Sequence, residues 1–364
     1  MNQFIVSARK YRPTAFDEVV GQQHVTQTLH NAIKNDHLAQ ALLFTGPRGV
    51  GKTTCARILA KMINLENQEG EPVKQEDQDF AFNIFELDAA SNNSVDDIRS
   101  LTEQVRFAPQ AGRYKVYIID EVHMLSQAAF NAFLKTLEEP PAHAIFILAT
   151  TEKHKVIPTI LSRCQIYDFK KITVENILQH LQKIADNQNI EADEEALRVI
   201  AQKADGALRD ALSIFDRIVS YSGEKITYKD VLENLRVLDY DYYFKTVETM
   251  LQNRQADLLN LFNEILELGF DGHIYINGLA SHLRDLLVSK QPETLPLLEV
   301  GDKVKERYKE QAGQVDSGIL LQALKLLAEA DYRYKTTVNQ RLLAELTLMQ
   351  IAQMHAPADE KKKP

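Results

Sequence analysis

The stretch GPRGVGKT, residues 46–53, has the composition and spacing of a phosphate-binding loop. It fits the pattern G-x-x-x-x-G-K-[ST], with an apolar run before it and a helical pattern after it. Glycines let the backbone approach a phosphate closely, and loop N–H groups offer positive potential to the anion. Lys52 could reach the β and γ phosphates, and the Thr53 hydroxyl could bind magnesium. A chance match in an ordinary loop is the alternative, which the flanking strand and helix patterns disfavour.

An acidic pair ends the apolar run VYIIDEV. The Asp120 carboxylate could hold magnesium through water and the Glu121 carboxylate could polarise an attacking water, since neighbouring side chains of a strand point in different directions. The alternative is a helix start with acidic residues in its first turn, and the phosphate loop in the same chain favours the catalytic interpretation. His123 follows closely and is interpreted as a structural residue rather than a metal ligand.

Two further stretches carry polar residues whose chemistry the local pattern leaves open. Thr150 and Thr151 end the run FILATT, where a hydroxyl could bind the γ-phosphate or the attacking water, although threonine is also simply a good strand residue. The stretch LSRCQIYDF places Arg163 beside Cys164. The cysteine could be a nucleophile, a metal ligand or a small buried residue. The arginine could be a surface charge or a cation offered to another chain.

Composition limits the class of protein. The chain has 364 residues, 45% hydrophobic and 26% charged, which is typical of a globular protein of two or three domains. Its apolar runs fall short of the ~20 residues that a membrane span needs, and the start MNQFIVSARKYRP lacks the apolar core of a signal peptide. Two cysteines, Cys55 and Cys164, cannot form a disulfide framework or a four-cysteine zinc site, which suits a cytoplasmic, reducing compartment. A net charge of -9 argues against a simple basic nucleic-acid binder but leaves room for a local basic groove.

The candidate residues follow predicted strands. Apolar, β-prone runs predict strands in ALLFTG, FNIFELDAA, YKVYIIDEV and AIFILATT, with helical patterns between them. This alternation over residues 41–150 predicts a parallel sheet covered by helices, with ligands bound at the carboxyl ends of the strands. Ser94 followed by Asp97 predicts a capping box at a helix start. After about residue 170 we expect helices and no clear strand.

Taken together, several stretches resemble one family: ARKYRPTAFDEVVGQ, GPRGVGKT, IIDEVHMLS, NAFLKTLEEPP, LATTEKHKVIPTILSRC and GALRDALSIFD. The combination resembles the bacterial DNA polymerase III gamma/tau subunit family, whose members are AAA+ motor subunits of the sliding-clamp loader. The similarity is dense over roughly residues 4–220. Residues 240–355 are similar to the family in their helical pattern more than in their exact amino-acid sequence.

The resemblance implies roles for the matching residues. Lys52 and Thr53 would bind ATP and Mg²⁺, Asp120 would assist the magnesium, and Glu121 would be the catalytic base. Thr151, with Thr150 as a second candidate, would be the first sensor of the γ-phosphate. The implied nucleotide-binding residues are Gly46, Pro47, Arg48, Gly49, Val50, Gly51, Lys52, Thr53, Thr54, Val19, Val20 and Arg209.

Three of these positions have more specific implied roles. Val19 and Val20 would lie along the adenine, and Arg209 would be the second sensor, linking the nucleotide state to the lid. Arg163 would act in trans on the ATP of an adjacent subunit, because arginine keeps its charge and can bond two phosphate oxygens at once. On this interpretation Cys164 is a small buried neighbour, and Cys55 is packed rather than reactive.

The implied fold is an α/β P-loop NTPase (AAA+) parallel sheet, followed by a small helical lid domain and an all-α collar domain. We place these domains at residues 1–170, 171–225 and 226–356, with a disordered tail at 357–364. Members of the family often carry four cysteines that form a zinc module between the phosphate loop and the acidic strand. The matching region here, NLENQEGEPVKQEDQDFAFN, has neither cysteine nor histidine, so we expect an acidic loop and no zinc.

The implied function is ATP-driven opening and loading of a sliding clamp onto primed DNA during replication, by an ATPase within the DNA polymerase III holoenzyme, a nucleotidyltransferase complex. The implied partners are delta-type and delta-prime-type clamp-loader subunits, copies of this chain, the sliding clamp and primer-template DNA, with no membrane. Another AAA+ DNA motor and a nucleotide-gated scaffold with little hydrolysis are the alternatives. Candidate DNA contacts are Ser91, Asn92, Asn93, Ser94 and Arg99, although the neighbouring Asp96 and Asp97 favour a plain helix cap equally.

Overall fold

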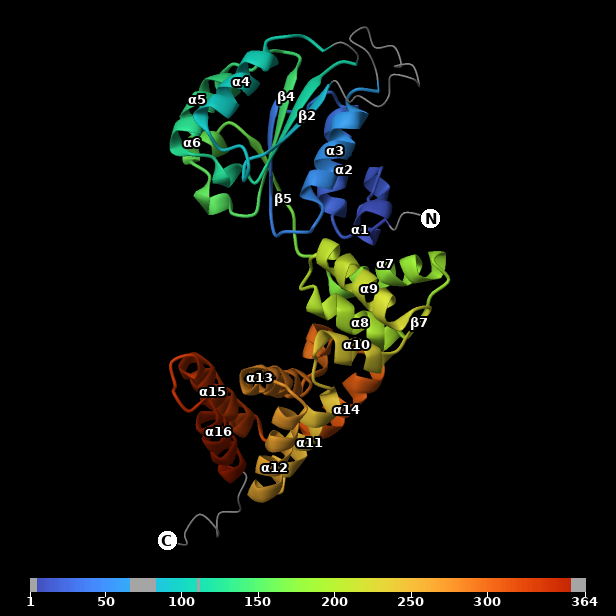
Figure 1. The fold of residues 1–364 in the computed structure, drawn as a ribbon, viewed down its shortest axis with the longest axis vertical. Coiled ribbons are helices and arrows are strands. Elements are labelled where there is room, and N and C mark those ends of the chain that lie inside the picture. The colour runs from blue at the N-terminus through green and yellow to red at the C-terminus, as the bar shows by residue number, and fades with distance from the viewer. Residues whose placement is uncertain (1–4, 66–82, 110–111, 355–364) are drawn as a thin grey trace. The chain divides into compact units, whose positions relative to one another are not determined.

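The computed structural model describes residues 5–65, 83–109 and 112–354. The chain divides into two compact units, Met1–Lys225 and Ile226–Pro364 (Figure 1). The predicted acidic loop after residue 65 and the predicted tail from residue 357 lie outside the described residues. The three domain boundaries predicted from the sequence stay predictions.

The first unit is built on a parallel five-stranded sheet with the strand order β2-β3-β4-β1-β5. The fourth strand in the sequence therefore lies between the first and the third, with Thr150 opposite Thr45 and Leu148 opposite Ile119. The strands are β1 Ala41–Thr45, β2 Ile84–Asp88, β3 Lys115–Asp120, β4 Ala144–Thr150 and β5 Gln165–Asp168.

Helices cover both faces of this sheet (Figure 1). Alternate residues of β1 show the two layers: Leu42 and Phe44 pack with α2 and α3, whereas Leu43 packs with α4 and α5. Because both faces are buried at the centre of the sheet, β1 and β4 are buried along their whole length. The covering helices are α2 Gln23–Lys34, α3 Lys52–Met62, α4 Val95–Val105 and α5 Gln127–Glu138. The α/β fold predicted from the sequence is confirmed.

Two sequence expectations about strands are corrected. The strand β5 was not predicted, because it lies at the sheet edge and only Tyr167 among its four residues is buried. The expectation that no strand follows residue 170 is wrong, because β6 Glu191–Ala192 pairs with β7 Lys225–Ile226. Strands of two residues are too short to show an alternating pattern.

Helices follow the sheet in the first unit, as the sequence predicts. The helices α7 Val174–Asn187, α8 Glu194–Lys203 and α9 Leu208–Ser222 pack on one another. Their apolar residues recur at helical spacing, as Ile177, Leu181 and Ile184 do on α7. The short elements of this unit are α1 Ser7–Lys10, η1 Phe16–Glu18, η3 Val122–Met124, η4 Lys153–Lys155 and α6 Pro158–Leu161.

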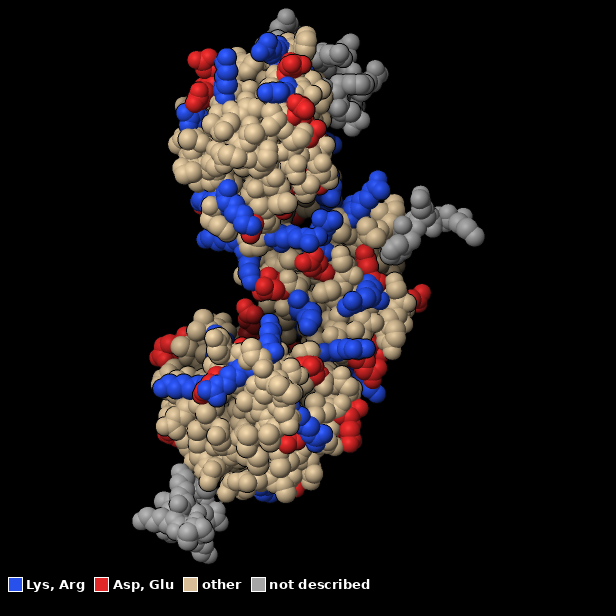
Figure 2. Space-filling model, turned by 60° about the vertical axis from the view of Figure 1, so that its left-hand side comes forward, with Lys and Arg blue, Asp and Glu red and all other residues tan. Residues whose placement is uncertain are grey.

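Charged residues are mixed over the surface. On the face shown in Figure 2, Lys and Arg side chains alternate with Asp and Glu side chains on both units, and wide areas carry neither. Below the wide uncharged area of the upper lobe in this view, several Lys and Arg side chains gather with few Asp and Glu side chains among them, so the net charge of the chain does not describe this face locally. None of the helices in the described part of the chain combines the length and apolarity that crossing a bilayer would take.

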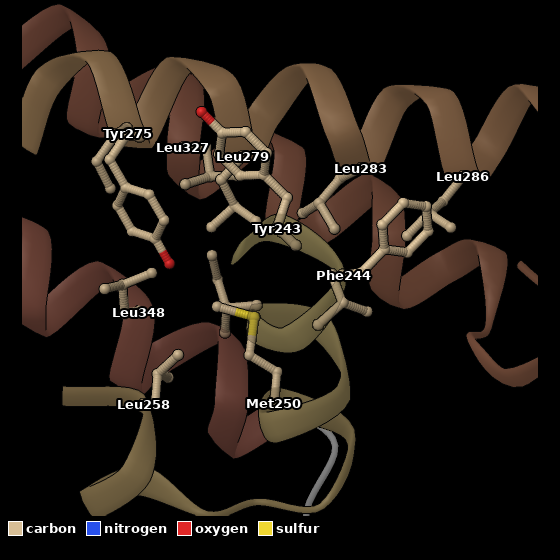
Figure 3. Packing of buried hydrophobic residues seen from close by; sticks show 14 of the residues in the cluster. Tyr243, Phe244, Met250, Leu258, Tyr275, Leu279, Leu283, Leu286, Leu327 and Leu348 are labelled. Carbon is tan, nitrogen blue, oxygen red and sulfur yellow. The ribbon is translucent and has the colours of Figure 1, made fainter. Parts of the chain in front are cut away.

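The second unit is helical, as predicted. It opens with α10 Tyr228–Leu235, and its core is built by α11 Tyr240–Leu251, α12 Gln255–Glu267, α13 Gly272–Val288, η5 Pro292–Leu297, α14 Asp302–Gln314, α15 Ser317–Tyr334 and α16 Gln340–Met354. Figure 3 shows Tyr243 and Phe244 of α11 packed toward Leu279 and Leu283 of α13. A Cβ at Gly278 would come within 1.9 Å of the Tyr243 hydroxyl, so glycine is required for this close packing.

A histidine is buried in this apolar core. The Nε2 of His282 lies 3.0 Å from Gln311 Oε1, and Nδ1 lies 2.9 Å from the Tyr308 hydroxyl. The amide of Gln311 donates in turn to the carbonyl of Phe244, at 2.9 Å. Since Gln311 Oε1 can only accept, Nε2 carries the proton and Nδ1 accepts from Tyr308. Burial lowers the pKa of His282 to about 4, so the ring is neutral at pH 7.

This buried histidine makes the stability of the second unit dependent on pH. Between its unfolded pKa of 6.5 and its folded pKa of about 4, the unfolded chain binds a proton that the folded chain does not. Stability therefore falls as the pH falls, and the loss from this residue is about 2 kcal/mol at pH 5 relative to neutral pH. Urea unfolding at pH 7 and pH 5 measures it. We expect His282→Gln to reduce the difference between the two pH values by this amount.

The matched control is Tyr308→Phe. It removes a hydrogen bond to His282 but keeps the titrating ring, so it should lower stability at pH 7 while keeping most of the pH difference. An unchanged pH difference in His282→Gln would show that another group causes it.

Candidate nucleotide-binding site

A pocket of about 600 Å³ lies in the first unit, where the phosphate loop meets the carboxyl ends of the strands. The start of α9 and residues of the N-terminal segment complete its wall. The sequence-predicted residues that line it are Val19, Val20, Arg48, Gly49, Val50, Gly51, Lys52, Thr53, Thr54, Asp120, Glu121 and Arg209. Gly46, Pro47, Thr150, Thr151 and Arg163 do not line it.

The phosphate loop needs its glycines. Gly46, Gly49 and Gly51 have φ angles of 143°, 76° and 101°, a region that side chains rarely adopt. A Cβ at Gly46 would also lie 2.3 Å from the carbonyl oxygen of Phe169. The loop therefore turns at the end of β1 against the residue that follows β5, and α3 begins immediately after Gly51.

Lys52 is held inside this loop. It is only 5% exposed, and its ammonium group donates to the carbonyls of Gly46 at 2.8 Å and Pro47 at 2.7 Å. Burial lowers the pKa of Lys52, while the nearby Glu121 and Asp120 carboxylates oppose the shift. The cation is thus placed at the turn of the loop, where phosphate oxygens could replace the two carbonyls as acceptors.

Thr53 and Asp120 form an oxygen-rich corner of the pocket. The Thr53 hydroxyl donates to Asp120 Oδ2 at 2.7 Å, which joins the first turn of α3 to the end of β3. A hydroxyl and a carboxylate are hard oxygen ligands of the kind that Mg²⁺ prefers, and the pair fits such an ion. Among the residues that the structure describes, no group of three or more His, Cys, Asp or Glu side chains could hold a metal ion by itself.

The central strand β4 brings a threonine to Glu121. Glu121 has a positive φ of 48°, and its Oε2 accepts from the Thr151 hydroxyl at 3.0 Å and from the Thr151 N–H at 3.2 Å. Thr150 is different, because its buried hydroxyl lies 3.0 Å from His123 Nδ1. Of the two threonines, Thr151 is the one that hydrogen-bonds the predicted base, and the sensor role of either residue stays a prediction.

His123 contacts residues that follow both β3 and β4 at this edge of the sheet. Its Nδ1 also lies 3.4 Å from Glu121 Oε2, and its Nε2 lies 3.3 Å from Glu152 Oε2. The ring is nearly buried, and its neighbours are a hydroxyl and two carboxylates that hold other partners. This arrangement agrees with the structural interpretation of His123.

Arg209 comes to the pocket from α9. Its backbone N–H donates to the carbonyl of Gly49 at 3.3 Å, so the first turn of this helix touches the phosphate loop directly. A Cβ at Gly49 would lie 3.0 Å from Ala207 Cβ, which shows how closely the two segments approach. Leu208 and Leu212 of the same helix also line the pocket.

Arg163 lies away from this pocket. Its guanidinium donates to Glu138 Oε1 at 2.5 Å and to the carbonyl of Thr159 at 2.7 Å. The structure therefore does not bring Arg163 to the pocket of its own chain.

The neighbouring Cys164 is half-buried against the sheet, and burial raises its pKa to about 11. Cys55 is fully buried with a pKa of about 12, so both thiols stay protonated at neutral pH and are poor nucleophiles.

Sequence reasoning missed the contribution of the N-terminal segment. Residues of this segment that line the pocket are Val6, Ala8, Arg9, Tyr11, Arg12 and Pro13. Asp88, Ala90 and Ile172 also line it. The cations of ARKYRP are a visible signal, since they directly precede the stretch that holds Val19 and Val20. The pattern alone does not show that they fold against the phosphate loop.

The predicted capping box is confirmed. Ser94 Oγ accepts from the Asp97 N–H at 3.2 Å, and the Asp97 carboxylate accepts from the Ser94 N–H at 3.1 Å. Arg99 lies 3.5 Å from Asp96. These groups already have partners within α4, and DNA contact by this stretch stays a prediction. The region in which no zinc is expected lies mostly outside the described residues.

Three family models match successive parts of the chain. The model described as DNA polymerase III, delta subunit, matches residues 21–173. The DNA polymerase III clamp loader subunit, ATPase lid domain, matches residues 176–224. The model of DNA polymerase III subunits gamma and tau domain III matches residues 226–363.

Curated gamma and tau subunits of DNA polymerase III are similar to this chain over nearly its whole length. The chain is 42% identical to DNA polymerase III subunit tau of Bacillus subtilis (strain 168), over 95% of this chain and 62% of that one. It is 32% identical to DNA polymerase III subunit gamma of Buchnera aphidicola subsp. Acyrthosiphon pisum (strain APS), over 95% of this chain and 98% of that one. The chain thus spans less than two thirds of the Bacillus subtilis relative.

Among solved structures, a Thermotoga maritima RuvB Holliday junction branch migration motor aligns with this chain at 23% identity and a TM-score of 0.49. The alignment covers 66% of this chain and 79% of the RuvB chain.

The tight approach of Gly46 to Phe169 gives a test of the loop. Gly46→Ala should destabilise the first unit by about 2 kcal/mol or more, because a Cβ would collide with a backbone carbonyl as well as strain φ. Gly223→Ala is the matched control, since its φ of 73° is also positive but nothing lies within 4 Å of its Cβ. Urea unfolding of both variants measures the difference, and equal losses would mean that the contact with Phe169 is easily relieved.

Proposed function

Because the chain belongs to the bacterial DNA polymerase III gamma/tau subunit family, we propose that it is an ATPase motor subunit of the clamp loader. It binds and hydrolyses ATP to open a sliding clamp and load it onto primed DNA. The observation that carries this proposal is the convergence of Lys52 and Thr53, Asp120 and Glu121, and Thr151 at one edge of the sheet.

Nucleotide binding would use the groups that the loop already presents. Lys52 and the backbone amides of the loop would bind the phosphates. The Lys52 ammonium group would then donate to phosphate oxygens instead of to the carbonyls of Gly46 and Pro47. Val19 and Val20 supply apolar contact for the adenine on the pocket wall. A volume of about 600 Å³ is within the usual range for a small-molecule site.

Magnesium would be held by the Thr53 hydroxyl and the Asp120 carboxylate. The ion would neutralise charge on the phosphate oxygens. The 2.7 Å hydrogen bond between these two groups keeps their oxygens together on one side of the loop before any ion arrives. Lys52 is close enough to both acidic side chains that each opposes the lowering of its pKa.

Glu121 would be the base that polarises the attacking water. Its Oε2 accepts two hydrogen bonds from Thr151, which occupy that oxygen. The Thr151 hydroxyl has one hydrogen to donate, so it can serve Glu121 or a γ-phosphate oxygen but not both fully. A γ-phosphate that drew this hydroxyl away would free Glu121 for water, which links the sensor to the base.

Arg163 would complete the site of a neighbouring subunit. Its guanidinium does not line the pocket of its own chain and is held at the chain surface by Glu138 and Thr159. In phosphoryl-transfer enzymes, an arginine supplied by another subunit contributes on the order of 10³–10⁵ in rate. Hydrolysis would then require assembled subunits.

The second unit would be the collar through which subunits assemble. Large apolar side chains are exposed on its last two helices, namely Leu321 and Tyr332 on α15 and Leu342 and Leu346 on α16. Exposed groups of this kind suit subunit contacts. Assembly would join copies of this chain with delta-type and delta-prime-type subunits, and the complex would act on the sliding clamp and primer-template DNA in the cytoplasm.

Replacement of Glu121 distinguishes an ATPase motor from a nucleotide-gated scaffold with little hydrolysis. Glu121→Gln keeps the shape of the side chain but removes the carboxylate, so ATP should bind normally while turnover of the assembled complex falls by about 10²–10⁴. Bound nucleotide should then be recovered as ATP rather than ADP. The control is Glu103→Gln on the exposed surface of α4, which should turn over normally. Turnover by Glu121→Gln at the wild-type rate would refute the assignment of the base.

The trans role of Arg163 gives a second test. Arg163→Ala should leave ATP affinity of the isolated chain within about twofold of wild type, because the guanidinium lies outside the pocket, and should lower turnover of the assembled complex by about 10³. Arg106→Ala, at the end of α4, is the matched control for loss of an exposed arginine. If the isolated wild-type chain hydrolyses ATP at the full rate of the complex, no residue from another subunit is needed.

A further inference from the structure

A nearly buried histidine lies next to the predicted catalytic base. The side chain of His123 is only 7% exposed, and its Nδ1 lies 3.4 Å from Glu121 Oε2. The same nitrogen lies 3.0 Å from the Thr150 hydroxyl, and Nε2 lies 3.3 Å from Glu152 Oε2. Among the residues described, those that line the pocket include Glu121 but not His123. Any part that this ring plays in hydrolysis would therefore pass through a neighbouring side chain.

A short turn fixes the place of the ring. Glu121 has a positive φ of 48° and directly precedes η3, in which the Met124 N–H donates to the Glu121 carbonyl at 2.8 Å. On either side of His123, Val122 and Leu125 are buried in the core that the sheet forms with α4 and α5. Because the turn is anchored on both sides of His123, the ring is kept against the end of β4.

The hydrogens available at this cluster decide which contacts can form together. The Glu121 and Glu152 carboxylates can only accept, so each bonds the ring through a nitrogen that carries a hydrogen. The Thr150 hydroxyl can donate or accept, and it already accepts from the Glu152 N–H at 3.0 Å. A neutral ring can therefore serve one carboxylate, and a protonated ring can serve both. The ring is thus a second donor for Glu121, besides Thr151.

A second donor matters when the first is drawn away. The Thr151 hydroxyl and N–H both donate to Glu121 Oε2, at 3.0 Å and 3.2 Å. A γ-phosphate that attracted the hydroxyl would leave the carboxylate with a single contact from this residue. A general base acts only while it is held within hydrogen-bond reach of its water. A carboxylate has about four acceptor sites, so a contact with His123 would hold Glu121 and still leave capacity for the water.

We propose that His123 is the positioning residue of Glu121, and that it holds the carboxylate toward the attacking water when the nucleotide draws the Thr151 hydroxyl away. The inference rests on the proposed function and adds a role in hydrolysis to a residue that the sequence suggests is only structural. Since His123 lies outside the pocket, its loss should slow hydrolysis and leave nucleotide binding intact.

Turnover by the assembled complex and ATP binding by the full chain test this role together. His123→Ala should lower kcat by about 10-fold to 10²-fold, the usual effect of a misplaced catalytic group, and keep ATP affinity within about twofold of wild type. His154→Ala replaces an exposed histidine of η4 and is the matched control, with normal turnover expected. A normal kcat in His123→Ala would overturn the inference.

Two conservative variants identify the contact that matters. An asparagine can place a polar atom near the position of Nδ1, whereas a glutamine can place one near that of Nε2. His123→Asn can therefore keep the contact with Glu121 and should recover part of the lost kcat. His123→Gln can keep the contact with Glu152 only and should recover less. Recovery by His123→Asn no greater than by His123→Gln would assign the effect to packing or to Glu152, against the proposal.

A double-mutant cycle tests whether the histidine acts through the base. In single-turnover measurements, His123→Ala added to Glu121→Gln should cause no further loss of rate, because the carboxylate that it positions is already gone. A full additional loss would show that His123 acts on another group. Thermal unfolding and ATP affinity separate this role from a loosened fold, since a merely structural residue would lower Tm and affinity along with kcat.

The outcomes distinguish this inference from the function on which it rests. If the wild-type complex hydrolyses ATP and His123→Ala does so at the same rate, the positioning role is wrong while the proposed function stands. If the wild-type complex assembles but hydrolyses no ATP, the proposed function fails and this inference fails with it.

Discussion

The pairing of β4 between β1 and β3 is the constraint on which the candidate site depends. Parallel hydrogen bonding sets Thr150 opposite Thr45 and Leu148 opposite Ile119, so the ends of the three strands meet at one edge. The phosphate loop follows β1 and the acidic pair follows β3, and both therefore lie one strand away from Thr151. Had β3 paired directly with β1, the acidic pair would adjoin the loop but no threonine could lie between them.

The residues whose roles depend on local pattern could be predicted from the sequence. The glycine and lysine spacing of the loop, the acidic end of β3 and the capping box of Ser94 and Asp97 are each encoded within about ten residues. The order of the strands is not encoded locally, because it results from pairing between residues as far apart as Leu42 and Gln165, which are 123 positions apart. For that reason the sequence could not decide between Thr150 and Thr151. In the fold, one hydroxyl meets His123 and the other meets Glu121.

The parts that sequence reasoning missed have weak or distant signals. The strand β5 presents a single buried residue, Tyr167, so it lacks the continuous apolar run of the central strands. The N-terminal segment is held on α9 by a distant contact, in which the Ser7 N–H donates to Asp216, a residue 209 positions later. No periodicity in ARKYRP indicates that contact. Such a segment is recognised by what holds it in place rather than by its own composition.

The arginines of the first unit fall into two groups that suit opposite roles. Arg163 is held by Glu138 and a backbone carbonyl, so its position is fixed on its own chain before any partner arrives. Arg12 and Arg209 line the pocket and have no side-chain hydrogen bond or ion pair in the described part of the chain, although Asp88, Asp120 and Glu121 line the same pocket. A fixed cation loses less conformational entropy when it meets a neighbouring subunit. Unpaired cations inside a pocket instead retain their attraction for a polyphosphate, and binding would stabilise the segments that carry them. On our proposal, a site divided in this way would bind its nucleotide within one chain and complete its chemistry between two.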